Sequence, residues 1–234
     1  MSRIPLLFLP GLLCDEHLWK AQAEALSDIA ECTIADLTQD DSISAMAERA
    51  LSIAPPHFAL AALSMGGYVA FEIMRQAPER VSRLALFDTS AAPDNAERKV
   101  QSQATISSLQ HGRFTGVTSR LLPRLVHASH VAGAVGEEVR AMAARVGGDA
   151  FLRQQTAILG RPDSRPTLSR IKVPTLVAVG DSDVLTPVED ALEIHRDVAG
   201  STFAVIENCG HLPALERPEE TTRLLKNWLQ SPPN

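Results

Sequence analysis

The sequence of 234 residues carries a formal net charge of −6, with 45% hydrophobic and 21% charged residues. These values are ordinary for a soluble globular chain that buries one core, as one domain or as one domain with an insertion. The negative balance and the absence of a long basic run argue against a nucleic-acid-binding surface and against binding to an anionic membrane.

Three cysteines, Cys14, Cys32 and Cys209, are present. Their odd number and unpaired spacing do not indicate a disulfide framework, and free thiols fit a reducing compartment, so we expect a cytoplasmic protein. No Cys-x-x-Cys pair suggests zinc, and we expect neither a metal nor a cofactor. No apolar run approaches the length of a membrane-spanning helix.

The first predicted element is a buried strand over Ile4–Leu9, which a sharp turn at Pro10-Gly11 ends. Arg3 and this apolar run imitate the start of a signal peptide. However, Pro10-Gly11 interrupts the run. The charged stretch Asp15–Lys20 also precedes Ala21-Gln22-Ala23, the segment that imitates a cleavage site. We therefore interpret the segment as a strand followed by a loop.

The next segments alternate between helix and strand. A helix is predicted over His17–Leu26 and a second strand over Cys32–Leu37. An amphipathic helix follows, because apolar residues recur there at helical spacing. The predicted inward faces of the two helices are Leu18, Ala21 and Ala25, and then Ile43, Met46, Ala47 and Ala50.

A serine between a buried strand and a helix is the most informative feature of the chain. The apolar run His57–Ala62 predicts the strand, and Tyr68–Ala77 predicts the helix. Ser64 lies between them, with the small residues Ala62 and Gly66 two positions before and after it. This layout is typical of a nucleophile elbow, in which a tight strand-to-helix turn presents the serine oxygen. The alternative is a serine that caps the helix.

After a fourth strand over Val81–Asp88, the alternation stops. We predict that residues 91–166 form a helical cap inserted into a core made of residues 1–90 and 167–234. One cap helix ends at Gly147-Gly148 and a second is capped by Asp149. Their predicted inward stripes are Val135, Val139, Met142 and Val146 in the first, and Leu152, Thr156 and Leu159 in the second.

The alternation then resumes with strands over Val173–Gly180 and Thr202–Ile206. A capping box at Thr186–Glu189 starts the helix between them, and a last helix opens at Pro218. The inward face of that last helix is predicted to be Leu224, Leu225, Trp228 and Leu229. The fold class that follows is α/β: a three-layer α/β/α sandwich with a mainly parallel sheet of about six strands.

Two further polar residues follow strands at the edge where such sheets bind ligands. Asp183 follows the fifth strand in Gly-Asp-Ser-Asp, and His211 follows the sixth strand in Gly-His. A serine nucleophile needs a base, and the base needs a group that holds its ring in one tautomer. The chain order Ser64, Asp183, His211 suits this chemistry on this kind of sheet. Asp181 and Asp88 are competing candidates for the acid.

These motifs together resemble the α/β-hydrolase superfamily over nearly the whole chain. The resemblance implies that Ser64 is the nucleophile, His211 the general base and then acid, and Asp183 the orienting carboxylate. It also implies an oxyanion hole from the backbone N–H groups of Met65 and Leu12. Where the family often has His-Gly-x, this chain has Pro-Gly-Leu. The family usually has two more strands before the first one predicted here.

The leading hypothesis is a serine hydrolase that cleaves a carboxylic ester of a small or medium substrate through an acyl-enzyme. The elbow and cap resemble those of small-cap esterases, and the expected pocket residues are Trp19, Leu185 and Leu212. A second hypothesis uses the same triad for C–C bond hydrolysis, thioester or acyl transfer, or a lyase reaction. A third is a binding protein with slow turnover, because fold alone does not fix function. The sequence does not indicate an oligomeric state.

Overall fold

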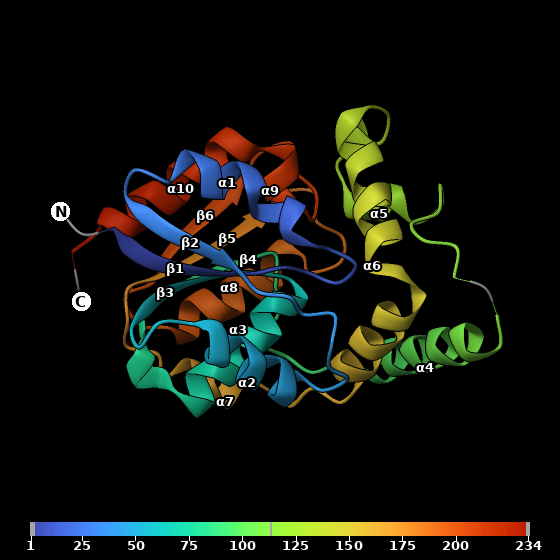
Figure 1. The fold of residues 1–234 in the computed structure, drawn as a ribbon, viewed down its shortest axis with the longest axis horizontal. Coiled ribbons are helices and arrows are strands. Elements are labelled where there is room, and N and C mark those ends of the chain that lie inside the picture. Colours follow the sequence, from blue (N-terminus) through green and yellow to red (C-terminus); the bar gives the residue numbers. More distant parts are fainter. Residues whose placement is uncertain (1–2, 113, 233–234) are drawn as a thin grey trace.

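A computed structural model describes residues 3–112 and 114–232 of the chain. Six strands form one sheet in the order β2-β1-β3-β4-β5-β6, and every neighbouring pair runs parallel (Figure 1). The predicted fold class is therefore confirmed. The strands are β1 Ile4–Leu9, β2 Ala30–Ile34, β3 Phe58–Leu63, β4 Val81–Phe87, β5 Thr175–Gly180 and β6 Thr202–Ile206.

Helices cover both faces of the sheet, as crossover connections between parallel strands require. One face carries α1 Lys20–Ala25, α9 Pro213–Glu216 and α10 Pro218–Gln230 (Figure 1). The opposite face carries α2 Ile43–Ile53, α3 Met65–Gln76, α7 Arg165–Leu168 and α8 Val188–Asp197. Two short 3₁₀ helices, η1 Glu16–Trp19 and η2 Pro78–Arg80, complete this part of the chain.

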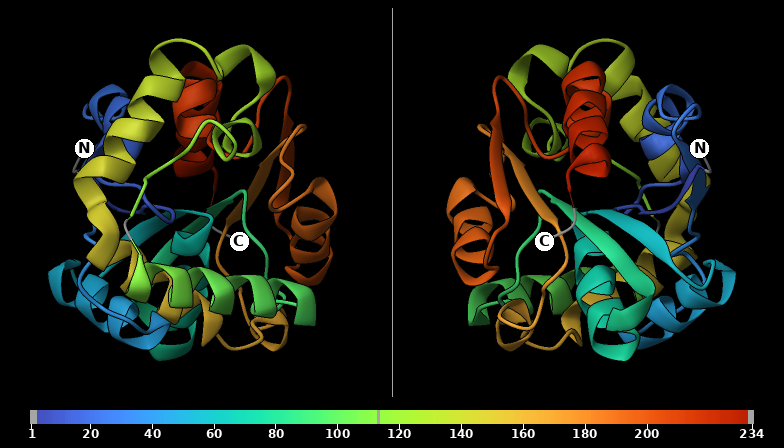
Figure 2. Two further views of the ribbon diagram at one scale, coloured as in Figure 1. Left: turned by 90° about the vertical axis from the view of Figure 1, so that its right-hand side faces the viewer. Right: turned by 90° about the vertical axis from the view of Figure 1, so that its left-hand side faces the viewer.

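The described segment between β4 and β5 is helical. It contains α4 Ala96–His111, α5 Leu122–Leu125, η3 Ala128–His130 and α6 Ala134–Leu159 before α7. Figures 1 and 2 show α4, α5 and α6 at the side of the sheet opposite the two termini. Because β1 starts at the N-terminus and all strands are parallel, this is the side where the strands end. The helices therefore stand over the edge at which we predicted the chemistry.

The core consists of two apolar clusters, one on each face of the sheet. All six residues of β3 are buried, because both of its faces are covered. Successive side chains along a strand point to opposite faces. Accordingly, Leu60 and Ala62 pack in the cluster with α2 and α3, whereas Ala59 and Ala61 pack in the cluster with α10.

Two predicted elements near the N-terminus need correction. The strand predicted over Cys32–Leu37 is β2, which starts earlier because Ala30 pairs with Ile4, and the later apolar residues are buried in the loop that follows. The helix predicted over His17–Leu26 is divided into η1 and α1. Its buried face includes Gln22 rather than Ala21 and Ala25, since the Gln22 side chain donates to the Ala214 carbonyl oxygen (3.1 Å).

The predicted break between two cap helices is confirmed at Gly147. This residue has φ 76° and ψ 173° inside α6, a conformation that glycine adopts readily, so two helical stretches meet there at a kink. The inward stripe predicted for the second stretch is wrong, since Thr156 is exposed. The buried residues there are Ala150, Gln154 and Ala157. Gln154 is among them because its side chain forms hydrogen bonds to the backbone of two core loops.

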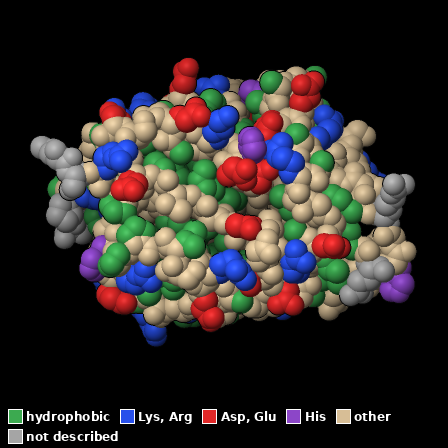
Figure 3. All heavy atoms as spheres, in the orientation of Figure 1, with side chains coloured by type: hydrophobic (Ala, Val, Ile, Leu, Met, Phe, Trp, Pro, Cys, Tyr) green, Lys and Arg blue, Asp and Glu red, His purple; other side chains and the backbone are tan. Residues whose placement is uncertain are grey.

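The surface and the helices show two further features. On the face drawn in Figure 3, acidic and basic side chains are interspersed. Among residues 3–112 and 114–232, no helix has the length and apolar character needed to cross a bilayer. The described inward face of α10 includes Leu225, Trp228 and Leu229, while Leu224 is half-buried.

Candidate active site

Ser64 occupies a tight turn between β3 and α3. Its backbone has φ 55° and ψ −116°, a sparsely populated conformation for a residue with a side chain. The turn is held from both sides: the Ser64 N–H donates to the Phe87 carbonyl oxygen (3.0 Å), and the Ser64 carbonyl oxygen accepts from the Thr89 hydroxyl (2.8 Å). The Ser64 side chain makes no capping bond to α3, so the helix-cap alternative is wrong.

Glycine at position 66 is required by the close approach of β1. A Cβ placed on Gly66 would lie 2.4 Å from the Leu9 carbonyl oxygen, which no real side chain tolerates. Gly67 is equally constrained, because its Cβ would lie 2.3 Å from Thr89 Oγ1. Ala62, where glycine is the usual residue, is fully buried with its methyl group in the core. The turn therefore has the form predicted for a nucleophile elbow.

The structure brings together Ser64, His211 and Asp183. The Ser64 hydroxyl oxygen lies 2.8 Å from Nε2 of His211, and Nδ1 of His211 lies 2.7 Å from Oδ2 of Asp183. An Nδ1–H that donates to Asp183 leaves Nε2 as the acceptor of the serine proton. His211 and Asp183 are both buried, so water competes little for these hydrogen bonds.

The hydrogen-bond donors around Asp183 stabilise its ionised form, although the side chain is buried. Desolvation alone would raise its pKa, but the His211 ring and the neighbouring donors outweigh it and lower the pKa below its ordinary value. Oδ2 accepts from the Thr186 hydroxyl (2.7 Å) and Oδ1 from the Leu185 N–H (2.8 Å). The predicted capping box at Thr186–Glu189 is therefore wrong: Thr186 bonds to Asp183, and Pro187 is the residue that precedes α8.

Asp88, the competing acid at the end of β4, lies next to this site in a different state. Its Oδ1 accepts from the Gly180 N–H (2.9 Å), while its Oδ2 is buried with no hydrogen-bond partner among the described residues. Burial raises the pKa of Asp88 well above its ordinary value, and the charge of Asp183 acts in the same direction. Both influences favour the neutral form of Asp88. The carboxylate that contacts His211 is that of Asp183.

Two other carboxylates hold the loops of the site in place. Asp181, a competing candidate for the acid, instead accepts from the backbone N–H groups of Asn208 (2.9 Å) and Cys209 (3.1 Å). Glu216 accepts from the N–H groups of Gly210 (3.1 Å) and Leu212 (3.0 Å), on either side of His211. Glu216 is thus a structural partner of the loop that carries His211.

Gly210, which precedes His211, packs closely against the cap. A Cβ on Gly210 would lie 2.6 Å from the backbone nitrogen of His127, so glycine allows this close approach. Gly180 packs just as closely on the carbonyl oxygen of Gly210. The end of β5, the loop that carries His211 and the cap therefore pack closely against one another.

The loop after β1 lies beside the serine turn. A Cβ on Gly11 would lie 3.5 Å from the Ser64 Cβ. Leu13 has φ 60°, and its N–H donates to Oε1 of Gln154 (3.1 Å), whose Nε2 donates to the Leu37 carbonyl oxygen (3.1 Å). Gln154 thus links the cap to this loop. No local pattern signals this role, because the partners of Gln154 are 141 and 117 residues away along the chain.

A cavity of about 350 Å³ opens above Ser64. Leu185 and Leu212, two of the three expected pocket residues, line it together with Leu12. Trp19, the third, does not: it is fully buried, its ring stacks on Phe8 with centroids 4.8 Å apart, and its Nε1–H donates to the Leu9 carbonyl oxygen (3.3 Å). The correction follows from η1, which turns Trp19 into the core.

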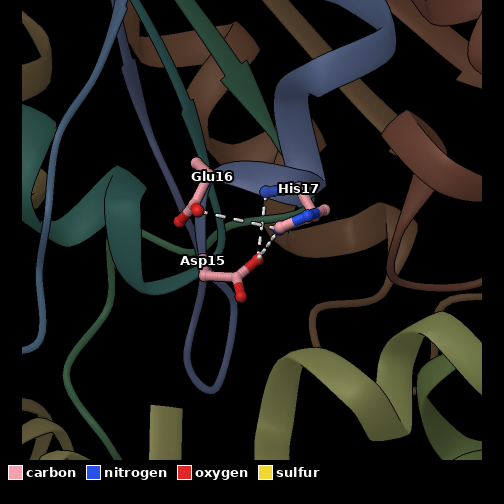
Figure 4. Close-up of side chains that lie close together, drawn as sticks. All are labelled: Asp15, Glu16 and His17. Atoms are coloured by element: carbon pink, nitrogen blue, oxygen red, sulfur yellow. Dashed lines mark hydrogen bonds and ion pairs between the residues drawn. The ribbon is translucent and has the colours of Figure 1, made fainter. Parts of the chain in front are cut away.

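In the part of the chain that the structure describes, two clusters place three potential metal ligands together. One is Asp88, Asp183 and His211, where hydrogen bonds already occupy the ionised carboxylate. The other is Asp15, Glu16 and His17 (Figure 4). There, Asp15 accepts from the His17 N–H (3.0 Å) and pairs with the Arg145 guanidinium (2.5 Å), which neutralises the charge a cation would need. Neither cluster fits a metal ion.

The cysteines near the site are not reactive groups. Cys14 and Cys209 are buried free thiols. Burial raises the pKa of Cys14 to about 12 and also raises that of Cys209, so both stay protonated. They pack as small apolar residues in the core.

Comparison with known proteins agrees with this arrangement. The chain is 26% identical over 173 residues to the pimeloyl-[acyl-carrier protein] methyl ester esterase of Neisseria meningitidis serogroup C, which covers 71% of this chain and 67% of that protein. It is 27% identical over 232 residues to the Nitrosomonas europaea protein of the same name, covering 92% and 91%. For two further curated relatives, the match covers only 55% and 22% of their length.

Among solved structures, a thermophilic esterase from Thermogutta terrifontis with malate bound superimposes with a TM-score of 0.87 at 30% identity. The match covers 98% of this chain and 90% of that one. The three proteins named above are esterases by name, as the sequence hypothesis expected, whereas the relative matched over 22% of its length is a proline iminopeptidase. The model of the Alpha/beta hydrolase family matches residues 7–224, most of the sequence. The chain belongs to the Alpha/beta hydrolase family.

Proposed function

We propose that this protein hydrolyses a carboxylic ester of a small or medium substrate, with Ser64 as nucleophile, His211 as general base and then acid, and Asp183 as the orienting carboxylate. One observation carries the proposal: the 2.8 Å contact from Ser64 Oγ to His211 Nε2 continues through the 2.7 Å contact from His211 Nδ1 to Asp183 Oδ2. Such a chain of contacts activates a hydroxyl that is otherwise a weak nucleophile at neutral pH.

Acylation uses both nitrogen atoms of the His211 ring. The Ser64 hydroxyl gives its proton to Nε2 while Oγ bonds to the ester carbonyl carbon, whose oxygen becomes an oxyanion. The backbone N–H groups of Leu12 and Met65 are the proposed donors to that oxyanion. Neither has a hydrogen-bond acceptor among the described residues. The intermediate collapses when the ester C–O bond breaks, and Nε2–H protonates the leaving alcohol.

Deacylation repeats the sequence with water. A water molecule gives a proton to His211 Nε2, and its oxygen bonds to the acyl carbon. The Ser64 ester bond then breaks, the carboxylic acid leaves, and the proton returns to Ser64 Oγ. Asp183 stays ionised throughout, and its charge stabilises the imidazolium at each step. The lowered pKa of Asp183 supports this role.

The role of residues 91–166 and the location of the protein in the cell belong to the same proposal. We propose that residues 91–166 act as a cap that shapes the substrate pocket, which is supported by the cavity-lining residues Val117, Leu121 and Met142. We also propose a cytoplasmic location, which the free thiols of Cys14, Cys32 and Cys209 support, because reducing compartments keep thiols unpaired.

The test is the Ser64→Ala variant with 4-nitrophenyl butyrate as substrate. Removing Oγ should lower kcat by about 10⁴-fold or more. Ser52→Ala is the matched control, because Ser52 lies on the exposed surface of α2 and bonds only to the Arg49 carbonyl oxygen. Equal loss in both variants, or unchanged turnover in Ser64→Ala, would remove the proposed nucleophile.

A further inference from the structure

The cavity above Ser64 has an apolar part and a polar part. The apolar part comes from core loops and from α5 and α6, with Leu63, Val139 and Met142 among its residues. The polar part comes largely from one side of α4, where Arg98, Ser102 and Thr105 recur at helical spacing. A substrate that fills the cavity therefore meets polar groups away from the apolar wall.

The charges in the lining do not cancel. Asp94 is the only acidic residue among the described lining residues, and it already pairs with Arg161 (2.9 Å) in a largely buried contact. Arg98 and Arg124 also line the cavity. Within residues 3–112 and 114–232, neither of these two arginines has an acidic group within ion-pair distance.

The two guanidinium groups keep donors to spare. Arg98 uses one nitrogen to donate to the Leu185 carbonyl oxygen (2.8 Å), which anchors α4 to the loop after β5. Within the described part of the chain, the guanidinium of Arg124 makes no hydrogen bond, and only its backbone N–H donates, to the Leu121 carbonyl oxygen (2.9 Å). A guanidinium has five N–H donors in a planar fork, which matches a carboxylate. Both arginines are exposed and can reach a ligand at the mouth of the cavity.

The sign of these charges is opposite to that of the whole protein. With a net charge of −6, the chain repels an anionic substrate at long range. Arg98, whose charge also acts on the half-buried Asp190, and Arg124 place positive charge in the lining of the cavity, where it favours an anionic group on the ligand. A cavity of about 350 Å³ also has room for an ester with a second functional group.

We propose that the substrate is an ester that carries a carboxylate on its acyl or alcohol half, bound at the cavity mouth by the guanidinium groups of Arg98 and Arg124. This inference rests on the proposed ester hydrolysis at Ser64 and adds the substrate class. The carboxylate would accept hydrogen bonds from the two side chains while the scissile carbonyl lies at Ser64. The apolar wall would pack against the methylene groups between the two.

Two matched substrate pairs test the preference, each differing only in a carboxylate replaced by a neutral amide. The first pair, monomethyl glutarate and methyl glutaramate, places the group on the acyl half. The second pair, 3-acetoxypropanoate and 3-acetoxypropanamide, places it on the alcohol half. We expect kcat/KM to favour the charged member of at least one pair by about ten-fold, mainly through KM. This preference should fall as the salt concentration rises.

The arginines are tested by Arg98→Gln/Arg124→Gln and by the single variant Arg124→Gln, because the Arg124 side chain is exposed and makes no hydrogen bond or ion pair with the described residues. Each should lower kcat/KM more for the charged ester than for the amide, and the double variant should abolish the preference. Arg120→Gln is the matched control, because Arg120 is an exposed cap arginine outside the cavity lining.

The outcomes separate the two proposals. Equal hydrolysis of charged and neutral members in both pairs, or a preference that survives in the double variant, overturns the carboxylate site and leaves the esterase proposal intact. No hydrolysis of these four esters or of 4-nitrophenyl butyrate overturns the esterase proposal itself.

Discussion

Asp88 and Asp183 end neighbouring parallel strands, both are buried, and their side-chain oxygens lie within 4.8 Å of each other. Their pKa values nevertheless move in opposite directions. Asp183 has a histidine ring, a hydroxyl and a backbone N–H as donors. Among the described residues, Asp88 has only the Gly180 N–H as a donor, on one of its two oxygens.

The comparison teaches that hydrogen-bond donors, and not depth or position on the sheet, decide which carboxyl group is ionised. Desolvation acts on both groups, and two adjacent buried carboxylates would repel each other strongly. The opposite directions of the two pKa shifts favour a proton on Asp88, the group with fewer donors. The following predictions test this division of roles, beginning with the largest expected effect.

Asp183→Asn should lower kcat by about 10³–10⁴-fold. The amide can no longer accept the Nδ1–H of His211 in the same way and offers its own N–H instead, which favours the wrong tautomer of the ring. Steady-state hydrolysis of 4-nitrophenyl butyrate measures the effect. Near-normal activity would mean that another group, with Asp88 the first candidate, orients His211.

Thr186→Val should lower kcat by about ten-fold, because it removes the hydroxyl donor to Oδ2 of Asp183 at almost constant volume. Thr175→Val is the matched control. Thr175 starts β5, at the opposite end of the strand, and its hydroxyl bonds to the Val173 carbonyl oxygen. A loss of the same size in both variants would indicate a general effect on folding rather than on Asp183.

Asp88→Asn should change kcat by less than about three-fold. Asparagine resembles the neutral form that burial favours for Asp88, and its oxygen can still accept from the Gly180 N–H. If Asp88 were ionised, the substitution would remove a negative charge beside His211 and shift the acidic limb of the pH–rate profile to lower pH. An unchanged acidic limb is the expected result.

The same variant should gain stability relative to the wild type as pH rises. A carboxyl group with a raised folded-state pKa stabilises the protein fully below its unfolded pKa of about 3.9, and that contribution is lost as pH rises through the folded pKa. Asparagine has no such loss. The difference in Tm between Asp88→Asn and wild type should therefore increase from about pH 4 to pH 7, with about 2–4 °C for each kcal/mol. A constant difference would contradict a protonated Asp88.

Local patterns predicted the frame of the molecule well. Continuous apolar runs located the strands, and Ser64, Asp183 and His211 each follow a strand that ends at the same edge. Parallel pairing then brings these residues together without further information. The amphipathic stripe of α2 was also predicted, because Ile43, Met46, Ala47 and Ala50 are all buried.

Features that depend on partners distant in sequence were missed. The side chains of Gln22, Gln154 and Thr186 are buried polar groups, and their roles follow from hydrogen bonds to other segments or to a neighbouring turn. Trp19 was misplaced for a related reason: its indole completes a core cluster that includes Phe8 and Phe87. Periodicity alone does not reveal such tertiary contacts.

The central claim is that His211 activates the hydroxyl of Ser64, and covalent labelling tests it most directly. The protein is treated with a fluorophosphonate, and the adduct is located by mass spectrometry of the intact chain and of its peptides. We predict a single adduct on the peptide that contains Ser64, no adduct in Ser64→Ala, and much slower labelling in His211→Ala. An adduct on any other residue, or equal labelling of wild type and Ser64→Ala, would contradict the account.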